Sequence, residues 1–477
     1  MPRPLALLLA VALVQGVAWT ALTPPLQGPD ESEHVAYTQQ LAETGHGPKT
    51  AGGTGVQSGE QSLVGYGLNL LPLRGHLDGR PPWGALPSVT TALDRLPASA
   101  RKDGTGPNAV GQNPPLYYAL QAVVYRLSPD RSLLARMTLM RLANVLLYVG
   151  AVGLAWMLAG ELFARAWLRT LATSLVVLHP KLVSLAGYVN PDMLLVVLST
   201  GFLVAAVRLV RRGATPGRVA TTAALAGAAA LTHGRGFFLL PPAIVAIAIA
   251  CLRLPRPRLK TSARLAGLGA ALFAVPAILA VLWTRSDTGG SAFGGQISQT
   301  ASQAFNIRQF ASYLWQFFFP RLSFMDPMVG PPYGYRQVFI ETFFGGWGNY
   351  EVNFSASTYD LLRVAAYVGL IALLVTTVVR WRELVARWPT VTVVVVTVVS
   401  LLGLLLITNY RDVSGGGSPL ITGRYLLPGI SLFAIAIAWV VGSLPRRVGP
   451  IAGALLIAMA ALLAVEGLLL NIQRFYG

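Results

Sequence analysis

The sequence predicts an all-helical, polytopic membrane protein, and three features support that prediction. Of its 477 residues, 54% are hydrophobic and 12% are charged, whereas soluble domains carry roughly 25% charged residues. Apolar runs of about 20 residues recur along the chain, the length at which a helix crosses a bilayer core. The net charge of +18 gathers in short loops between those runs, as in the positively charged cytoplasmic loops of membrane proteins. The basic character therefore does not indicate nucleic-acid binding.

We expect about eleven transmembrane helices, with ends accurate to a few residues. The predicted spans are 5–22, 134–160, 167–187, 191–210, 217–232, 237–253, 264–284, 360–380, 389–408, 422–442 and 448–471. The first run could instead be a secretory signal peptide. No clean small-x-small site with a polar flank follows it, so an uncleaved first helix is the preferred interpretation. The lone Cys251 lies in an apolar run, which excludes a disulfide framework and a cysteine metal site.

The distribution of charge predicts the topology. With a cytoplasmic N-terminus, the inner loops hold most of the basic residues: Arg165, Arg169, Arg208, Arg211, Arg212, Arg218, Arg253, Arg256, Arg258, Lys260, Arg264, Arg380, Arg382, Arg387, Arg446 and Arg447. Only Glu161 and Glu383 of the 19 acidic residues fall in those loops. Adding or removing one early span would place basic loops on both sides, so we predict a multi-pass protein of the cell inner (cytoplasmic) membrane with this orientation.

Two long segments lie on the outer side of this single predicted domain, which covers residues 1–477. They are 23–133 and 285–359, and structureless loops of that length are uncommon unless they are functional. Each contains an aromatic, apolar stretch too short to span comfortably: "NPPLYYALQAVVYRL" at 113–127 and "SYLWQFFFPRL" at 312–322. We therefore expect amphipathic helices that lie at the membrane interface in both segments.

The predicted topology brings four polar stretches to the outer face. They are "GPDESEHVAY" (28–37), "HPKLVSLAGYVNPDM" (179–193), "THGRG" (232–236) and "NYRDVSGGGSPLITGRYLLP" (409–428). Ionisable groups close to the hydrocarbon core of a bilayer are unfavourable in free energy, and those that occur there tend to be functional. The four stretches together predict one composite site at the outer mouth of the bundle.

The first stretch has the densest charge. If it opens a helix, Asp30 and His34 are at i and i+4, with Glu33 and Tyr37 near the same face and Pro29 in the first turn. The acids could simply complement the dipole of an interfacial helix, or a carboxylate could serve as a general base. Metal binding by Asp30 and His34 is the weaker interpretation, because no second pair of ligands is evident.

The middle two stretches offer further polar groups with two interpretations each. Asn190 and Asp192 could cap the start of a span or could bind substrate. His233 with Arg235 could be a pair at a helix end that reaches the interface, or part of the site.

Arg424 begins an apolar span and precedes Tyr425. It could be an interface anchor, but a guanidinium at the membrane boundary is also well suited to bidentate recognition of phosphate. The residues expected to contact substrate are His34, Tyr37, Asn190, Asp192, His233, Arg235, Arg424 and Tyr425.

These pieces resemble the GT-C superfamily of polyprenyl-phosphate-dependent glycosyltransferases, which includes protein O-mannosyltransferases and the lipid A aminoarabinose transferase. The chain more closely resembles a group of bacterial membrane proteins that itself resembles that superfamily. The pieces that carry the resemblance are "PDESEH" (29–34), "NPPLYY" (113–118), "NPDML" (190–194), "YLWQFFFPRL" (313–322) and "GRYLLP" (423–428). Each piece is short, but the ordered set extends over nearly the whole chain.

The resemblance implies a GT-C-like bundle that transfers a sugar from a polyprenyl-phosphate donor to a glycan, lipid or protein acceptor in the cell envelope. It implies that Asp30 is the catalytic base, that Glu31 is the second acid of a pair, and that transfer inverts the anomeric centre. No cofactor is expected, and the sequence does not decide whether a divalent cation such as Mg or Mn is required. The best-studied branches of the superfamily have no fixed histidine at the position of His34, so the resemblance assigns this residue no role. The expected partners are the donor, the acceptor and membrane lipids, without nucleic acid.

The residues agree with this chemistry but leave alternatives. Transfer needs a base for the acceptor's proton and cations for the departing phosphate, which Arg424, Arg235, Lys181 or His233 could supply. A polysaccharide polymerase or ligase would use the same groups with a longer lipid-linked donor. A lipid or solute transporter would need charges at mid-membrane depth, whereas the predicted spans hold few, such as Glu466. A scaffold would need neither the acids nor the arginine.

Overall fold

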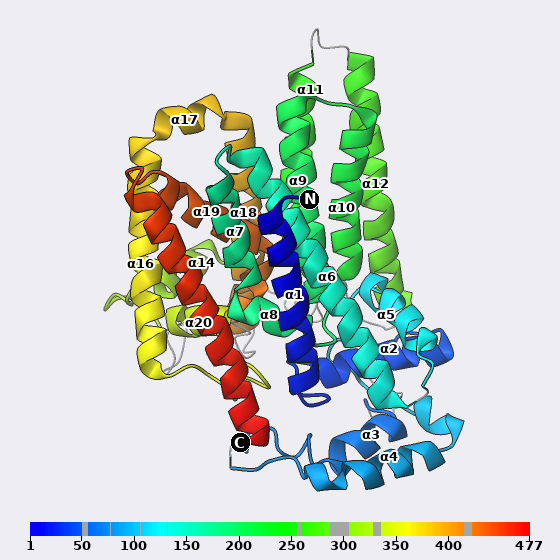
Figure 1. Ribbon diagram of the computed structural model, residues 1–477. Helices are drawn as coiled ribbons and strands as arrows, with labels where there is room; N and C mark the ends of the chain where they lie inside the picture. Colours follow the sequence, from blue (N-terminus) through cyan, green and yellow to red (C-terminus); the bar gives the residue numbers. More distant parts are fainter. Residues whose placement is uncertain are drawn as a thin grey trace.

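The computed structural model describes residues 1–49, 56–76, 78–104, 106–130, 132–254, 259–286, 305–327, 335–414 and 422–477. This described part is helical, and its only extended pairing is an isolated bridge between Trp347 and Val352. The helices (Figure 1) are α1 Arg3–Leu22, α2 Glu31–Thr44, α3 Gly59–Gly67, η1 Trp83–Ala85, α4 Leu86–Arg95, η2 Ala98–Arg101, α5 Leu116–Leu127, α6 Leu133–Leu162, α7 Ala166–Val177, α8 Pro180–Ala186, α9 Asp192–Arg212, α10 Pro216–Thr232, η3 Gly234–Leu239, α11 Leu240–Leu252, α12 Leu259–Ser286, α14 Ile307–Phe318, α15 Tyr335–Phe344, α16 Ala356–Val379, α17 Trp381–Ala386, α18 Trp388–Ser414, η4 Gly423–Gly429, α19 Ile430–Gly442 and α20 Val448–Tyr476.

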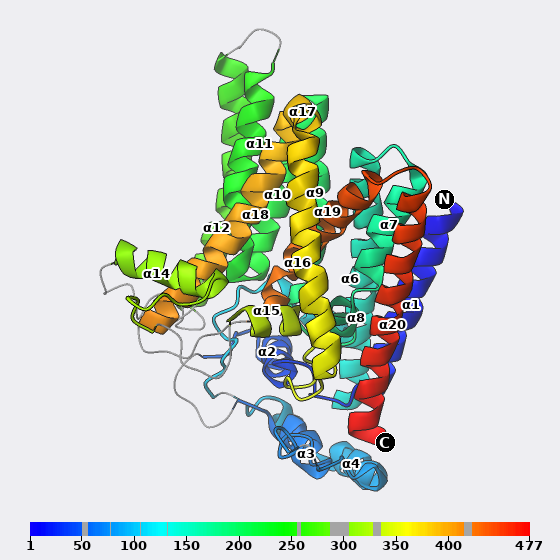
Figure 2. The same cartoon turned by 90° about the vertical axis from the view of Figure 1, so that its left-hand side faces the viewer.

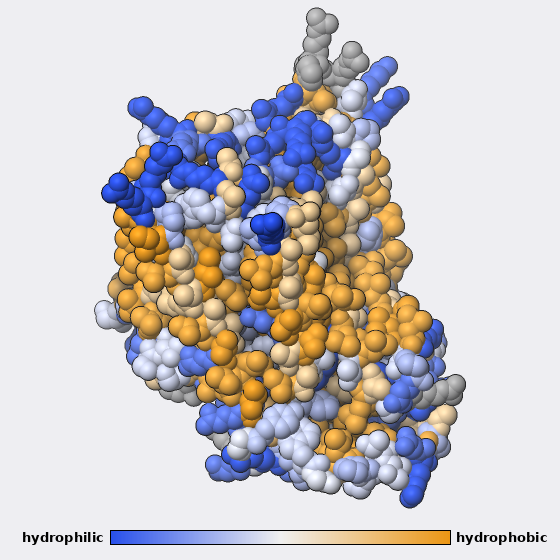
Figure 3. Space-filling view, viewed as in Figure 1, coloured by the Kyte–Doolittle hydropathy of each residue, from blue (hydrophilic) through white to orange (hydrophobic). Residues whose placement is uncertain are grey.

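The bundle crosses a membrane. Within the described residues, 9 helical segments are long and apolar enough to span a bilayer: α1, α6, α9, η3 with α11, α12, α16, α18, η4 with α19, and α20. Their apolar side chains form a broad hydrophobic band across the molecule, and hydrophilic residues gather above it (Figure 3). The prediction of an all-helical polytopic membrane protein is confirmed.

The two remaining predicted spans are helical, but neither forms a single helix of 18 residues or more. The prediction of one continuous span at 167–187 is wrong, because α7 ends at Val177 and α8 begins at Pro180. Proline lacks a backbone N–H and is tolerated at the start of a helix but not inside it. His179 accepts a hydrogen bond from the Leu182 N–H, at 3.4 Å, and so caps α8. The span predicted at 217–232 is α10, which has 17 residues.

Helix α9 lies at the centre of the bundle, where it packs against α6, α10 and α11. Nearly all of its side chains are buried, from Asp192 to Val210. A helix that is apolar around its whole circumference is stable only when other helices or lipid surround it. The N-terminus of α9 therefore delivers Asp192 to a fixed, buried position at one end of the bundle.

Several shorter helices run across the long ones at that end. Helix α14 lies across the bundle axis, and α2 is seen nearly end-on in the same view (Figure 2). Helices α5 and α14 correspond to the interfacial helices predicted at 113–127 and 312–322. Residues 50–55, 77, 105 and 131 of the first predicted outer segment, residues 287–304 and 328–334 of the second, and residues 415–421 of the polar stretch 409–428 lie outside the described residues.

The arginine-rich loops lie at the other end of the molecule. There Glu161 at the end of α6 forms ion pairs with Arg208 and Arg212 at the end of α9, in which its Oε1 lies 2.7 Å from Nε of Arg208 and 2.5 Å from Nη2 of Arg212. These cations also complement the negative end of the α9 dipole. The two ends of the bundle thus differ in charge, as the topology prediction requires.

Candidate active site

The segment between α1 and α2 has an unusual backbone. Leu26 and Asp30 adopt left-handed conformations, with φ of 64° and 57°. Such values are uncommon for residues other than glycine, although Asp tolerates them better than most. The sequence interpretation placed Pro29 and Asp30 inside a helix, whereas α2 begins at Glu31 and Asp30 is its N-cap residue. Strained backbone of this kind persists only where the surroundings fix it, and it concentrates at functional sites.

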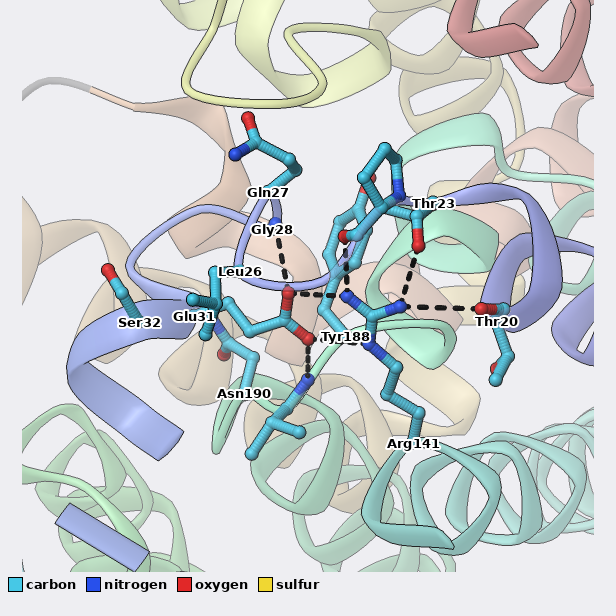
Figure 4. Close-up of polar contacts among 12 residues, drawn as sticks. Thr20, Thr23, Leu26, Gln27, Gly28, Glu31, Ser32, Arg141, Tyr188 and Asn190 are labelled. Atoms are coloured by element: carbon cyan, nitrogen blue, oxygen red, sulfur yellow. Dashed lines mark hydrogen bonds and ion pairs between the residues drawn. The ribbon is translucent and has the colours of Figure 1, made fainter. Parts of the chain in front are cut away.

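A buried ion pair provides that support (Figure 4). Glu31 is fully buried, and its two carboxylate oxygens accept hydrogen bonds from Nε and Nη2 of Arg141, at 2.8 and 2.6 Å. The same oxygens accept the backbone N–H groups of Val189 (3.0 Å) and Gly28 (3.1 Å). The carboxylate is therefore saturated, which is the condition for a buried charge to be tolerated.

Arg141 ties the pair to the end of α1. Its Nη1 donates to the carbonyls of Thr23 and Thr20, at 2.7 and 3.3 Å, and its Nη2 donates to that of Pro24, at 2.9 Å. Gly28 completes the arrangement, because a Cβ there would lie 2.7 Å from the ring of Tyr188. The Glu31–Arg141 pair thus joins α1, α2, α6 and the segment before α9, and it fixes the backbone that carries Asp30.

Asp30 itself faces the opposite way, toward η4. Its Oδ2 accepts a hydrogen bond from Nη2 of Arg424 at 2.9 Å. The Asp30 side chain is 52% exposed, whereas that of Arg424 is 5% exposed. Asp30 makes no side-chain cap to the helix that it precedes. The structure therefore brings together the first and last of the predicted polar stretches, with the carboxylate at the surface and the guanidinium beneath it.

A second carboxylate and a second guanidinium complete the cluster. Asp192 Oδ1 accepts from Nη2 of Arg235 at 2.5 Å, and its Oδ2 lies 3.4 Å from Nε of Arg424. The ring of Tyr425 contacts both cations, with its centroid 3.9 Å from the guanidinium carbon of Arg235 and 5.5 Å from that of Arg424. Cation–π attraction of this kind helps to hold two like charges close together.

The cations have unused donors. Nε and Nη1 of Arg424 and Nη1 of Arg235 are buried without a hydrogen-bond partner among the described residues. Lys181 is also fully buried; its Nζ contacts the carbonyl of Gly346 and lies 5.3 Å from the centroid of the Tyr350 ring. Buried polar groups are almost always satisfied, so orphaned donors on cations require an explanation.

The charges in this cluster are two guanidinium groups (Arg424 and Arg235) and two carboxylates (Asp30 and Asp192). The guanidinium donors that lack a hydrogen-bond partner among the described residues fit an anion with several acceptor oxygens.

His34 lies behind Asp30 as a structural bridge. Oδ1 of Asn190 accepts the Asp192 N–H at 2.8 Å, so its Nδ2 is the atom that faces His34 Nε2 at 3.4 Å. The imidazole must therefore accept at Nε2 and carry its proton on Nδ1, which lies 2.8 Å from Oη of Tyr118. Burial lowers the pKa of His34 to about 4, so the ring is neutral at physiological pH.

Tyr37 and His233 have structural contacts. Tyr37 stacks on Tyr118 with centroids 3.7 Å apart, and its Oη accepts a hydrogen bond from Trp283 of α12 at 2.9 Å. Nδ1 of His233 accepts the Arg235 N–H at 3.0 Å and so caps η3. The structure thus places Asp30, Asp192, Arg235, Arg424 and Tyr425 in one cluster, with His34 and Asn190 behind it, Tyr37 adjacent, and Glu31 within the supporting ion pair.

Partial burial alone would raise the pKa of Asp30, but the charge of Arg424 and its hydrogen bond hold that pKa below its ordinary value. His34 contributes in the same direction, because it is protonated at the low pH at which Asp30 titrates. Asp30 is therefore ionised at neutral pH and can accept a proton. Among the described residues, no three His, Cys, Asp or Glu side chains converge in a way that could hold a metal ion.

Sequence reasoning missed two parts of the site. Arg141 lies within a predicted span, and an arginine inside an apolar run is a recognisable signal that was passed over. The loop between α15 and α16 was also missed, although "GGWGNY" at 345–350 is glycine-rich. In that loop Gly346, Gly348 and Tyr350 have positive φ, and Tyr350 donates to Thr422 Oγ1 at 3.3 Å. Thr422 in turn accepts the Arg424 N–H.

Comparisons with known proteins agree with this architecture. Residues 13–465 match the family model described as "Predicted membrane protein (DUF2142)". No curated protein sequence matches the chain. The archaeal oligosaccharyltransferase AglB from Archaeoglobus fulgidus, in complex with an inhibitory peptide and a dolichol-phosphate, is similar with a TM-score of 0.55 and 13% identity, over 99% of this chain and 56% of that chain.

Two further solved structures are similar. The apo form of the Archaeoglobus fulgidus oligosaccharyltransferase gives a TM-score of 0.51 at 13% identity, over 99% of this chain and 56% of that one. ArnT from Cupriavidus metallidurans bound to undecaprenyl phosphate gives 0.49 at 16%, over 96% and 64%. The chain thus spans 56% to 64% of the length of these proteins. At such identities the similarity to AglB establishes the fold, which is GT-C-like, and not the activity.

Proposed function

We propose that this chain, which belongs to the DUF2142 family of membrane proteins, transfers a sugar from a polyprenyl-phosphate-linked donor to a cell-envelope acceptor at the outer face of the membrane. One observation supports the proposal above all others. A half-exposed carboxylate, Asp30, lies 2.9 Å from a buried guanidinium, Arg424, whose Nε and Nη1 have no hydrogen-bond partner in the described part of the chain.

The guanidinium donors fit the phosphate of the donor. Nη1 of Arg424 and Nη1 of Arg235 lie in one cluster, and neither has a hydrogen-bond partner among the residues that the structure describes, so two arginines can present donors to the oxygens of one phosphate. Arginine is well suited to phosphate because its donors match the geometry of the oxygens. Cations at this position would stabilise the charge that develops on the phosphate as the bond from the sugar to the phosphate oxygen breaks.

Asp30 is the candidate general base. The acceptor's hydroxyl oxygen would attack the anomeric carbon on the face opposite the phosphate and give its proton to the Asp30 carboxylate. The sugar–phosphate bond breaks in the same step, and polyprenyl phosphate leaves with the electron pair. Attack from the opposite face inverts the anomeric centre. The exposure of Asp30 supports this role, because an acceptor must reach the carboxylate from outside.

A groove for the lipid tail begins beside the cluster. An apolar cavity of about 870 Å³ runs between α10, α11 and α12, from Cys251 and Leu259 at one end to Phe237 and Leu282 at the other. Phe237 belongs to η3, the short helix that carries Arg235. Leu282 precedes Trp283, which contacts α2 through Tyr37. A phosphate at the arginines could therefore extend its polyprenyl chain directly into this groove.

The charge distribution supports the outer face as the location of the site. The acids and the cation cluster lie at the end of the bundle opposite the arginine-rich loops, and such loops stay on the cytoplasmic side. AglB, which shares the fold, was solved with a dolichol-phosphate, a lipid phosphate of the proposed class.

The test follows the leaving group, because its identity does not depend on which sugar is transferred. Purified protein is reconstituted in proteoliposomes with polyprenyl-phosphate sugars and acceptors extracted from cell envelopes, and released polyprenyl phosphate is measured by mass spectrometry. We expect release by the wild type and at least about 100-fold less by Asp30→Asn. Glu33→Gln, which removes a nearby charge of the same helix, should stay active.

Two results would contradict the proposal. Release at the wild-type rate by Asp30→Asn would remove Asp30 from the chemistry. A folded wild-type protein that neither binds a polyprenyl phosphate nor consumes any of the donors would remove the transferase function.

A further inference from the structure

The contact between Asp30 and Arg424 has a chemical consequence for the proposed function, on which this inference rests. The same guanidinium that would bind the donor's phosphate is occupied by the carboxylate that would act as base. We propose that this ion pair is a resting arrangement that the donor's phosphate opens, so that binding of the donor releases the base.

The geometry favours Asp30 as the partner that moves. Arg424 is held on several sides, because its side chain is buried, its backbone N–H bonds to Thr422, and its Nε lies 3.4 Å from Asp192. The Asp30 carboxylate is half-exposed, does not cap α2 and, among the described residues, accepts a side-chain hydrogen bond from Arg424 alone. Because Asp30 is half-exposed and the Arg424 guanidinium is buried beneath it, a phosphate that enters the cluster meets the carboxylate first. The carboxylate is therefore the group to be displaced.

Opening of the pair changes the strength of the base. The charged and titratable groups that face Asp30 are Arg424 on η4, His34 on α2, Asp192 on α9, Lys181 on α8 and Tyr350 in the loop before α16. His34 is neutral near pH 7. Once the carboxylate loses Arg424 and gains a phosphate as neighbour, attraction is replaced by repulsion. Its pKa rises, and it becomes a better proton acceptor only when a donor is present.

Thermodynamic linkage makes the arrangement measurable without turnover. If the phosphate weakens the hold of Arg424 on Asp30, then Asp30 must weaken the hold of Arg424 on the phosphate by the same factor. The Asp30→Asn variant, which cannot transfer sugar, should therefore bind polyprenyl phosphate more tightly than the wild type. We expect about a three- to tenfold lower Kd, because a partly exposed ion pair is being removed.

Asn is the appropriate replacement at this position. Asp30 has a φ of 57°, and Asn accepts the left-handed conformation at least as readily as Asp. Glu33→Gln is the matched control, since it removes one negative charge from the first turn of the same helix at a residue whose carboxylate bonds to Ser32 and not to Arg424. The Kd of this variant should change less than twofold, because a partly exposed charge beyond contact distance is screened.

A second measurement uses the unmodified protein. The probe is the methyl diester of polyprenyl phosphate, whose single charge does not titrate between about pH 4 and pH 8. Because the bound phosphate raises the pKa of Asp30, binding takes up a proton as pH falls through the raised value. Affinity of the wild type should therefore increase as pH decreases from 7 toward 4, and this increase should be absent in Asp30→Asn.

The outcomes separate the inference from the proposed function. Tighter binding by Asp30→Asn, with little change in Glu33→Gln, supports the displacement. Equal or weaker binding by Asp30→Asn in a wild type that does bind the lipid overturns the displacement but leaves the transferase intact. An equal decrease in Kd in both variants would mean that the loss of any nearby negative charge strengthens binding. That result also overturns the displacement. A wild type that binds no polyprenyl phosphate overturns both.

Discussion

Glu31→Gln tests the assignment of Glu31 as a positioning residue. The substitution keeps the shape of the side chain but replaces one carboxylate oxygen with an amide NH₂. Both oxygens of Glu31 face two N–H donors each, from Arg141 with either Val189 or Gly28. In either orientation, the new NH₂ group therefore points at two donors. The Arg141 guanidinium also loses its counter-ion in a buried environment.

The expected cost is large for a single conservative change. The side chains of Glu31 and Arg141 are 0% and 5% exposed, and removal of one member of a buried pair costs about 3–5 kcal/mol. A matched pair lies between the same two helices, where Arg136 of α6 contacts Glu43 of α2 at 3.2 Å. Glu43 is 19% exposed, so Glu43→Gln should cost less, about 1 kcal/mol.

Thermal unfolding in detergent, combined with a double-mutant cycle, supplies the measurement. Glu31→Gln and Arg141→Met should each lower stability strongly. The double variant should lose less than the sum of the two by about 1–3 kcal/mol, since the residues are in contact. Sugar transfer should fall in both single variants, because both release the backbone that carries Asp30. A Glu31→Gln protein with wild-type stability and no transfer would refute this reasoning and make Glu31 a reacting group.

Three further predictions concern the site and its support. Because Arg424 holds the pKa of Asp30 below its ordinary value of 3.8, kcat/KM for the donor should stay constant as pH falls from 7 to about 5 and decrease only near or below that ordinary value; loss of activity around pH 6 would contradict the pairing. His34→Leu removes one hydrogen-bond partner of Tyr118 Oη, which also accepts from Asn113, and should lower transfer by about tenfold, whereas His34→Asn keeps a donor near the Nδ1 position and should lower it less; equal losses would contradict the assigned tautomer. Gly423→Ala would place a Cβ 2.0 Å from a backbone carbonyl and should reduce both stability and transfer, while Gly369→Ala, whose Cβ meets nothing within 4 Å, should change neither; activity assays with melting curves compare the two variants.

Much of the architecture follows from the sequence because a bilayer imposes simple rules. Apolar length identified the membrane-crossing segments, and the arginines ordered the loops by side. The break between α7 and α8 could also be predicted from the sequence, since Pro180 cannot continue a helix without loss of a hydrogen bond. The apolar run is about 20 residues long, however, and that length favoured one continuous span.

The site was predictable as a set of stretches but not as a geometry. Asp30 and Arg424 are separated by 394 positions, and only the three-dimensional packing determines that they touch. The burial of Glu31 was equally hidden, because adjacent acids in "PDESEH" look alike in sequence. Their opposite roles follow from the left-handed turn at Asp30, which directs one carboxylate toward Arg141 and the other toward Arg424.

The most direct test of the central claim is a cryo-EM map of the protein with bound polyprenyl phosphate, collected for the wild type and for Asp30→Asn. The account predicts phosphate density within hydrogen-bond distance of Arg424 and Arg235, with the tail entering the groove between α11 and α12. In the wild type, the Asp30 carboxylate should have moved away from Arg424. A phosphate bound at the arginine-rich end, with the Asp30–Arg424 pair intact, would contradict the account.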